Sequence, residues 1–129
     1  MMVHIASAAP AMLVTDVFET AEFYRDVLGF SFDGVFGDPP SFVILDRGGA
    51  RLMCRQPRDG QIQAPNAASI GDFFDVFLYA DDVEALATEL RAKGAEIVHG
   101  PTYRPIWNGK ELAVRDCNGR TLCFGQSMG

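Results

Sequence analysis

The chain repeats one pattern of secondary structure along its length. Two similar segments, from Asp16 to Gly29 and from Asp81 to Gly94, begin at an acidic residue, continue with helical spacing and end at a glycine. A second pair of matching segments, Asp46 to Gly49 and Asp116 to Gly119, has the character of a turn. Each pair keeps one internal spacing, so the repeat predicts two equivalent modules with the same fold.

The first module is expected to fold as βαβββ. A strand over residues 9–15 precedes a helix over 16–29, in which acids lie early and apolar residues recur every three or four positions. The run Arg47-Gly48-Gly49 predicts a tight turn between two later strands. The three strands expected after the helix are 30–36, 41–46 and 50–56.

The second module is expected to repeat this order after a connecting loop. An aromatic strand over 73–80 precedes an amphipathic helix over 82–93, and strands follow over 95–98, 110–115 and 121–124. The predicted organisation is an N-terminal arm (1–8), a first module (9–56), a linker loop (57–72) and a second module (73–127), together one domain.

Alternation along the strands predicts which side chains leave the core. If Leu52 and Leu122 pack under the helices, then Met53 and Cys123 point to the opposite face of each sheet. The same parity places Asp75, Phe77 and Tyr79 on that far face. Two such faces, each curled inward, are expected to enclose a cleft lined by these side chains.

Charge and cysteine content restrict the partners and the location. Seventeen acidic and 11 basic residues give a net charge of −6, which makes nucleic acid an unexpected partner and favours a cationic ligand. No apolar run approaches the roughly 20 residues of a membrane helix, so no membrane partner is expected. The three cysteines include no C-x-x-C pair, which argues against a disulfide framework. No Lys or Arg precedes Arg25, so the charged start of a secretory signal is missing, and a cytoplasmic location is expected.

Two segments have the character of known family signatures: Asp16-Val17 with Phe23 to Phe30 in the first module, and Leu112 to Gly119 in the second. The first resembles the first-module signature of the vicinal oxygen chelate superfamily, and the second resembles its run before a D-P-x-G turn, with Cys117 in place of proline. That superfamily includes glyoxalase I, extradiol dioxygenases, fosfomycin-resistance enzymes and bleomycin-resistance proteins. The resemblance, which covers about residues 9–126, implies an α+β fold of two βαβββ modules whose curled mixed sheets surround a cleft.

The resemblance also implies where a metal would bind in the enzymes of this superfamily. Their four ligand positions correspond to Ala9, Met53, Asp75 and Cys123. Alanine cannot ligate, and a thioether suits hard divalent ions poorly, so neither a metal nor a cofactor is expected and no catalytic residue is assigned. The alternative is a metal-dependent glyoxalase-like lyase or isomerase, thiol transferase or extradiol dioxygenase, in which another donor joins Asp75.

Local likeness is greatest to the bleomycin-resistance proteins, which bind their ligand without metal and without chemistry. Residues 9–13 resemble their first strand, and residues 105–116 resemble their P-W-G-R-E segment, with Asn108 as an extra residue. The resemblance implies that Trp107 and an aromatic residue at Phe42 stack the planar part of a ligand. It therefore implies antibiotic resistance, a homodimer and a small-molecule-binding protein that sequesters a partly aromatic ligand.

The candidate ligand contacts combine stacking and charged groups, and each has a plainer alternative. Trp107 could belong to the core, Asp75 could pair with Arg115 or Arg51, and Glu111 could face solvent. Cys123 is expected to be a structural thiol, because no histidine lies on a matching strand face. The ten candidates are Trp107, Phe42, Tyr103, Asp75, Glu111, Phe77, Tyr79, Phe36, Met53 and Arg115.

Overall fold

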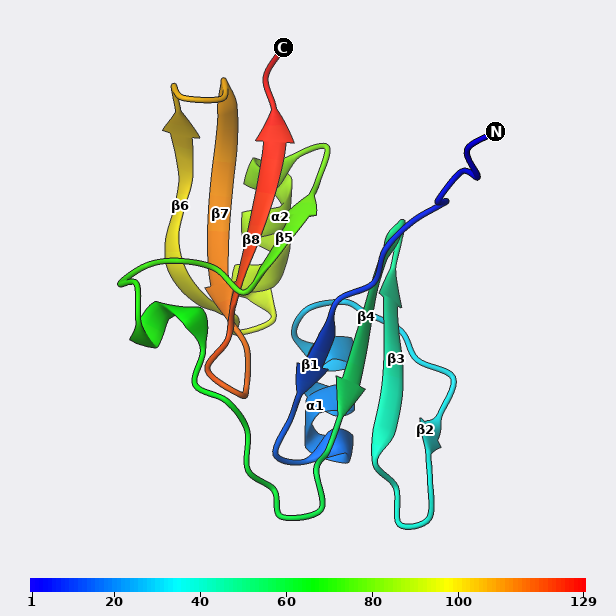
Figure 1. Ribbon diagram of the computed structural model, residues 1–129. Coiled ribbons are helices and arrows are strands. Elements are labelled where there is room, and N and C mark those ends of the chain that lie inside the picture. The colour runs from blue at the N-terminus through cyan, green and yellow to red at the C-terminus, as the bar shows by residue number, and fades with distance from the viewer.

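The computed structural model describes residues 1–129 and contains two βαβββ units (Figure 1). The first unit consists of β1 (Ala11–Leu13), α1 (Val17–Asp26), β2 (Val35–Phe36), β3 (Phe42–Arg47) and β4 (Ala50–Arg55). The second unit consists of β5 (Val76–Tyr79), α2 (Val83–Ala92), β6 (Glu96–Arg104), β7 (Gly109–Arg115) and β8 (Thr121–Ser127). The linker between them, residues 56–75 in the structure, holds a short 3-10 helix, η1 (Asn66–Ala68). The predicted duplicated α+β fold is confirmed.

Each unit forms one four-stranded sheet of mixed direction. The N-terminal sheet has the order β1-β4-β3-β2, and the C-terminal sheet has the equivalent order β5-β8-β7-β6. β1 runs parallel to its neighbour β4, and β5 runs parallel to its neighbour β8. All other neighbouring strands are antiparallel. Only Gly48 and Gly49 separate β3 from β4, and Gly48 has a φ of +55°, so the predicted tight turn is confirmed.

Capping residues explain where the two helices begin and end. The carboxylates of Asp16 and Asp82 each accept the backbone N–H of the residue three positions later. The second N-cap is Asp82, the first residue of the helix expected over 82–93, rather than Asp81, where the repeated segment begins. Gly29 and Gly94 follow the helices with φ of +73° and +84°, which glycine adopts most readily, and the predicted stops are confirmed.

Three strands differ in length from the prediction. The strand expected over 30–36 is reduced to β2, because Phe30 is buried with its ring 5.4 Å from that of Tyr24. The strand expected from residue 73 begins at Val76, since the preceding residues belong to the linker. In contrast, β6 continues to Arg104 instead of ending at 98, with register shifts on both sides of His99.

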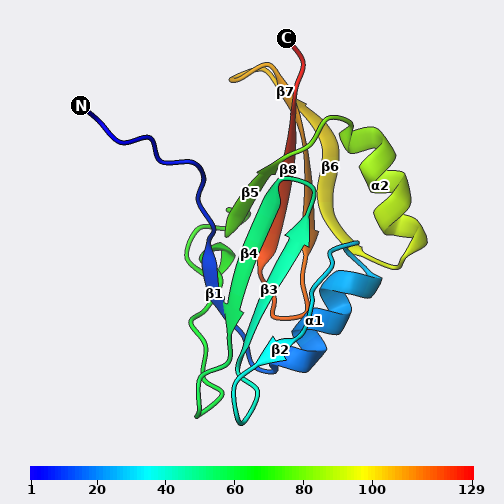
Figure 2. The ribbon, with the colours of Figure 1, turned by 90° about the vertical axis from the view of Figure 1, so that its right-hand side faces the viewer.

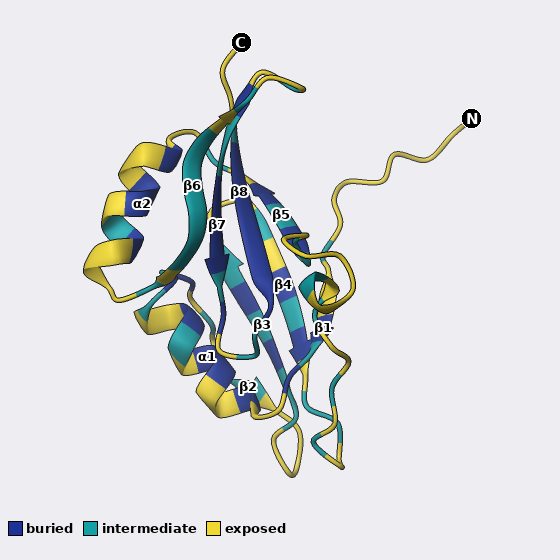
Figure 3. Cartoon of the chain, turned by 90° about the vertical axis from the view of Figure 1, so that its left-hand side faces the viewer, coloured by how far each residue is buried: buried dark blue, intermediate teal, exposed yellow.

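One hydrophobic core serves both units. Alternate strand residues and one face of each helix form a single cluster of 21 buried residues drawn from both sheets (Figure 3). Leu52 and Leu122 are both buried in it, as predicted, whereas Met53 on the other face is half-buried. Because both sheets face the same core, their opposite faces, here called the outer faces, point away from it.

The arrangement of layers separates the two outer faces. Both helices lie on the same side of the strands, and the two sheets diverge around them (Figures 1 and 2). The expected cleft between two inward-curling faces therefore does not form within one chain. The physical reason is that the helix-facing sides supply the strand residues of the shared core, which leaves the outer faces on the opposite side.

Polar contacts also join the two units. The Tyr24 hydroxyl on α1 donates a 2.6 Å hydrogen bond to Asp116 at the β7–β8 turn. The Arg47 guanidinium at the end of β3 donates to both carboxylate oxygens of Glu89 on α2, at 2.7 and 2.8 Å. Residues 1–8 lie exposed ahead of β1. Neither helix is long and apolar enough to cross a membrane.

Replacing Tyr24 with Phe tests the buried contact between the units. The variant leaves one oxygen of the buried Asp116 carboxylate without a donor, which costs about 1–3 kcal/mol of unfolding free energy. Burial raises the pKa of Asp116, and the Tyr24 hydrogen bond opposes that rise. The loss should therefore be largest at neutral pH and shrink as acid protonates the carboxyl. Urea denaturation at several pH values measures both effects.

The matched control for this variant is Tyr79→Phe. The Tyr79 ring is 83% exposed and its hydroxyl has no hydrogen-bond partner, so its removal should change the unfolding free energy by less than about 0.5 kcal/mol. Equal losses for the two variants, or a loss at Tyr24 that does not vary with pH, would contradict the assigned role of the buried contact.

Candidate functional site

Strand pairing arranges the outer face of the C-terminal sheet in rows. One row contains Phe77, Cys123, Ala113 and His99, and the next contains Tyr79, Gly125, Glu111 and Thr102. The buried residues Val76 and Leu78 point to the helix side. The predicted placement of Phe77, Tyr79 and Cys123 on the outer face is therefore confirmed.

An aromatic cluster covers this outer face near the β6–β7 turn. The Trp107 ring lies 6.1 Å from that of Phe77 at 75°, and Phe77 lies 5.2 Å from both Phe74 and Tyr79. We call Phe74, Phe77, Tyr79 and Trp107 the aromatic cluster. Trp107 is half-buried and does not belong to the hydrophobic core, so part of its ring faces solvent.

Two glycines provide the floor on which these rings lie. A Cβ atom at Gly109 would collide with the Trp107 ring. At Gly125 it would collide with Phe77 and come within 3.1 Å of Cη2 of Trp107. The absence of side chains at these two positions therefore lets both rings approach the backbone of β7 and β8.

The Glu111 carboxylate holds the tryptophan in place. One oxygen accepts a 2.9 Å hydrogen bond from Nε1 of Trp107, and the other accepts a 3.2 Å bond from Nε of Arg104. The Glu111 side chain is 18% exposed. Glu111 lies on the outer face, and both of its oxygens have partners inside the chain.

A pocket of about 330 Å³ lies beside the aromatic cluster, between the C-terminal sheet and the linker. Its floor includes Ala113, Thr121 and Cys123, and its linker wall includes Ile70, Phe73 and Phe74. Ile106, which is 94% exposed, lies at its edge. The volume is at the lower end of the range typical of small-molecule sites.

Cys123 at the floor of this pocket is a neutral thiol. Burial and the nearby Glu111 carboxylate raise its pKa to about 12, which keeps it protonated and a weak nucleophile at neutral pH. His99 lines the same pocket, contrary to the expectation that no histidine shares this face. The register shifts in β6, which the sequence did not reveal, place His99 in the row of Cys123.

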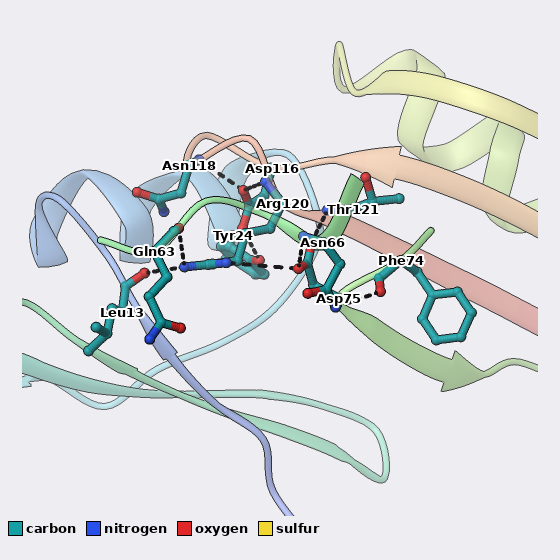
Figure 4. A network of polar contacts seen from close by, with 10 residues as sticks. All are labelled: Leu13, Tyr24, Gln63, Asn66, Phe74, Asp75, Asp116, Asn118, Arg120 and Thr121. Carbon is teal, nitrogen blue, oxygen red and sulfur yellow. Dashed lines mark hydrogen bonds and ion pairs between the residues drawn. The ribbon is translucent and has the colours of Figure 1, made fainter. Parts of the chain in front are cut away.

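Asp75 is engaged by groups of its own chain (Figure 4). One oxygen accepts the backbone N–H of Asn66 and the other that of Thr121, both at 2.9 Å. Nη1 of Arg120 lies 3.8 Å from the carboxylate. The Asp75 side chain is 8% exposed, so it presents little surface to a ligand in this conformation.

The two arginines considered as partners of Asp75 bind other acids. Arg51 pairs with Asp46 at 2.7 Å, and Arg115 lies 3.7 Å from Glu96. Neither of the two ion pairs given as the plainer alternative for Asp75 forms, and its basic neighbour is Arg120. Arg115, a candidate ligand contact, lies on the outer face of β7, opposite Thr121 of β8.

Tyr103 is separated from Trp107 by the sheet. It pairs in register with Lys110, whose amine reaches Glu84 on α2, whereas Glu111 and the tryptophan occupy the other face. The Tyr103 hydroxyl donates to Asn108 at 2.8 Å, and the ring is 49% exposed. The structure therefore does not bring Tyr103 into the aromatic cluster.

The remaining candidates lie on the outer face of the N-terminal sheet. Phe36 and Phe42 are direct partners across β2 and β3, and Met53 lies opposite Ile44 on the same face. Phe36 is 52% exposed, and Phe42 and Met53 are half-buried. Within one chain these three residues form a group apart from the aromatic cluster.

The four positions implied for a metal do not form a donor set. Ala9 has no donor, and the Asp75 carboxylate is already held by two N–H groups and an arginine, which leaves Cys123 as the one strong donor of the four. Met53 offers only a soft thioether. No group of three or more His, Cys, Asp and Glu side chains is placed to hold an ion. These residues do not fit the divalent ion of the metal-dependent members.

A larger groove of about 1030 Å³ runs between the two units. It is lined by the β3–β4 turn, β5 and the first part of α2. Phe77 and Tyr79 line it together with Val76 and Leu78, so both faces of β5 are represented. Because β5 is an edge strand, the groove follows an unpaired strand edge, and Trp107 does not line it.

Several residues of the site were missed by sequence reasoning. Arg104 and Arg120 bind carboxylates in the site but have no pattern that distinguishes them from surface arginines. Phe74 was assigned only to a strand. Gly125 offered one usable signal, since a glycine inside a strand suggests that another group approaches the backbone closely.

Comparisons with known proteins support the fold and its family. Residues 2–124 match the family described as the glyoxalase/bleomycin resistance protein/dioxygenase superfamily. A comparison with curated proteins finds no match. Among solved structures, a bleomycin resistance determinant encoded on the transposon Tn5 is 25% identical, with a TM-score of 0.74 and coverage of 97% of this chain and 100% of that one.

Two further structures share the fold at lower identity. TnmS3, an antibiotic-binding protein from Streptomyces sp. CB03234, is 20% identical, with a TM-score of 0.74 and coverage of 98% and 99%. TioX from Micromonospora sp. ML1 is 22% identical, with a TM-score of 0.71 and coverage of 95% and 100%. From the duplicated units and the match over almost its whole length, the chain belongs to the glyoxalase/bleomycin resistance protein/dioxygenase superfamily.

Proposed function

We propose that this chain is a metal-free small-molecule-binding protein that sequesters a partly aromatic ligand on the outer face of its C-terminal sheet. The single observation that carries the proposal is the partly exposed Trp107 ring, fixed by Glu111 beside a pocket. A ring that is already held in place loses little conformational freedom when a flat ligand stacks on it. The likeness to a bleomycin resistance determinant supports an antibiotic as the ligand and resistance by sequestration as the role.

Stacking and shape, rather than direct ion pairing, would select the ligand. Glu111 and Asp75 are the two acids expected to pair with a positive charge on the ligand, but both already accept hydrogen bonds within the chain. Asp72 lines the same pocket, is exposed and forms no ion pair, so a cationic group of the ligand would lie near it. The net charge of −6 adds a weaker, long-range attraction for cations.

A second copy of the chain would complete the site. The N-terminal outer face carries Phe36, Phe42 and Met53, which cannot reach the aromatic cluster of their own chain. Exposed apolar residues also surround the pocket, among them Ile70 at 64% and Ile106 at 94%. In the proposed homodimer, the N-terminal outer face of one copy covers the aromatic cluster of the other and shields these residues from water.

A titration of the chelator-treated protein tests metal-free binding. Metal-free bleomycin and the flat cation proflavine should quench the fluorescence of Trp107, the only tryptophan, with saturation at one ligand per chain. Added Mn²⁺ or Ni²⁺ should leave the curve unchanged. By calorimetry, Trp107→Ala should weaken binding at least about tenfold, because it removes the stacking surface. A response that requires the metal would overturn the proposal.

Gly125→Ala tests whether the position of the rings matters. The new methyl group displaces Phe77 and Trp107 without removing either ring, so the affinity for the same probes should fall about tenfold. Gly34→Ala is the control, because a Cβ atom there meets nothing within 4 Å and the backbone of neither glycine is left-handed. The two variants should differ in affinity by calorimetry, and equal affinities would exclude a role for the glycine floor.

Two matched phenylalanines test the proposed dimer. Phe36 on the N-terminal outer face and Phe18 on α1 are both 52% exposed. Sedimentation of the wild type should give twice the chain mass of 14.1 kDa. Phe36→Asp should shift the mass to that of one chain and weaken proflavine binding, whereas Phe18→Asp should change neither. A wild type that sediments as one chain while binding the probe fully would refute the shared site.

A further inference from the structure

The linker forms one wall of the pocket on the C-terminal sheet. Ile70, Phe73 and Phe74 line the pocket opposite its floor of sheet residues. Cys123 is only 2% exposed although it lies on the outer face of β8. The depth and shape of the pocket therefore depend on where the linker is held.

Asp75 lies at the end of the linker that leads into β5, and its side chain binds back to Asn66 within the linker. Its carboxylate accepts the backbone N–H of Asn66, and the amide group of Asn66 donates to the carbonyl oxygen of Phe74 at 3.2 Å. The other carboxylate oxygen accepts the N–H of Thr121 on β8. The buried Asp75 carboxylate thus ties the Asn66 end of the wall to the sheet, while the backbone N–H of Asp75 donates to the carbonyl oxygen of Thr121 at 2.8 Å and holds the other end.

Arg120 extends the same network to the first unit (Figure 4). Its Nη2 donates to the carbonyl oxygen of Gln63 in the linker at 3.4 Å and to that of Leu13 in β1 at 3.2 Å. Its Nη1 lies 3.8 Å from Asp75, and the Arg120 side chain is 9% exposed. Two buried opposite charges and the linker backbone therefore meet at the junction of both units.

We propose that Asp75 is a positioning residue, which with Arg120 clamps the linker onto both units and so sets the size of the ligand that the pocket accepts. The inference rests on the proposed function for its ligand and on the contacts of Asn66, Asp75 and Arg120 for its mechanism. Ile70, Phe73 and Phe74 make most of the wall that the clamp holds apolar, so the part of the ligand that lies against these three residues is an uncharged, apolar ring.

The chemistry of the clamp explains why it is rigid. A buried carboxylate is tolerated only when hydrogen bonds and an opposite charge replace its lost water. Moving the linker away would break two hydrogen bonds together, the one from the Asn66 N–H to Asp75 and the one from Arg120 to the Gln63 carbonyl oxygen. The polar network therefore opposes opening of the wall, even though the segment between its anchors contains only one short helix, η1.

Hydrogen exchange of the ligand-free protein tests the clamp directly. In Asp75→Asn, amides of residues 66–74 should exchange at least about tenfold faster than in wild type, while those of β3 and β4 keep their rates. Asn66→Ala removes only the bond to the Phe74 carbonyl from an exposed position, so it should fold normally and give about a threefold increase. Asp46→Asn, which breaks the exposed pair with Arg51, is the control and should leave the linker unchanged.

The ratio of the affinities for two ligands distinguishes a positioning role of Asp75 from a purely stabilising one. The probes are 2-naphthol, an uncharged ring small enough for the pocket, and metal-free bleomycin. Both clamp variants should lower the affinity ratio of 2-naphthol to bleomycin at least about threefold, whereas a loss of stability alone would lower both affinities together. Unchanged exchange in both variants, or an unchanged ratio with tight binding, would overturn the inference. If wild type binds neither probe, the proposed function fails, and the exchange rates alone decide whether the clamp exists.

Discussion

Burial of the helix-facing sides of both sheets in one core is the constraint on which the rest of the structure depends. That core draws 21 residues from both units. Once those sides are used, the two outer faces must point away from each other, and each carries only part of the candidate site. An aromatic cluster without a facing wall is the direct result, which is why the proposed function needs a second copy of the chain.

The cost of burying charge decides what the acidic residues of the site do. Asp75 and Glu111 were expected to meet a ligand, but each is largely buried and has hydrogen bonds to both oxygens. A carboxylate in such surroundings needs donors, and here the donors belong to the linker and to Trp107. In the proposed function both residues therefore position apolar walls, while aromatic rings would form the binding surface.

Predictions that depend on residues close together in the sequence were more accurate than predictions that depend on contacts between distant residues. The repeat, the turn at Gly48-Gly49 and the helix stops depend on neighbouring residues, and all were correct. The outer-face placement of Phe77 and Cys123 followed from simple alternation. His99 and Tyr103 lie beyond residue 98, where the strand was expected to end, so their faces were not predicted. Register shifts on both sides of His99 set its direction, and the pairing of Tyr103 with Lys110 puts Tyr103 on the other face from Glu111. Arg120 was not among the partners considered for Asp75, because the two residues are 45 positions apart in the sequence and come within 3.8 Å only after the sheet has formed.

By itself, the sequence determined the duplicated βαβββ order, the face on which most strand residues lie and the presence of Trp107 beside a strand with an acid nearby. These properties follow from periodicity, glycine conformations and chain connectivity, which act over a few residues. Only the tertiary structure decided that the outer faces diverge, that Glu111 orients Trp107 and that Asp75 and Arg120 clamp the linker. These features arise because segments far apart in the sequence pack into one core. Buried charges then form hydrogen bonds and ion pairs with the groups that this packing brings close to them.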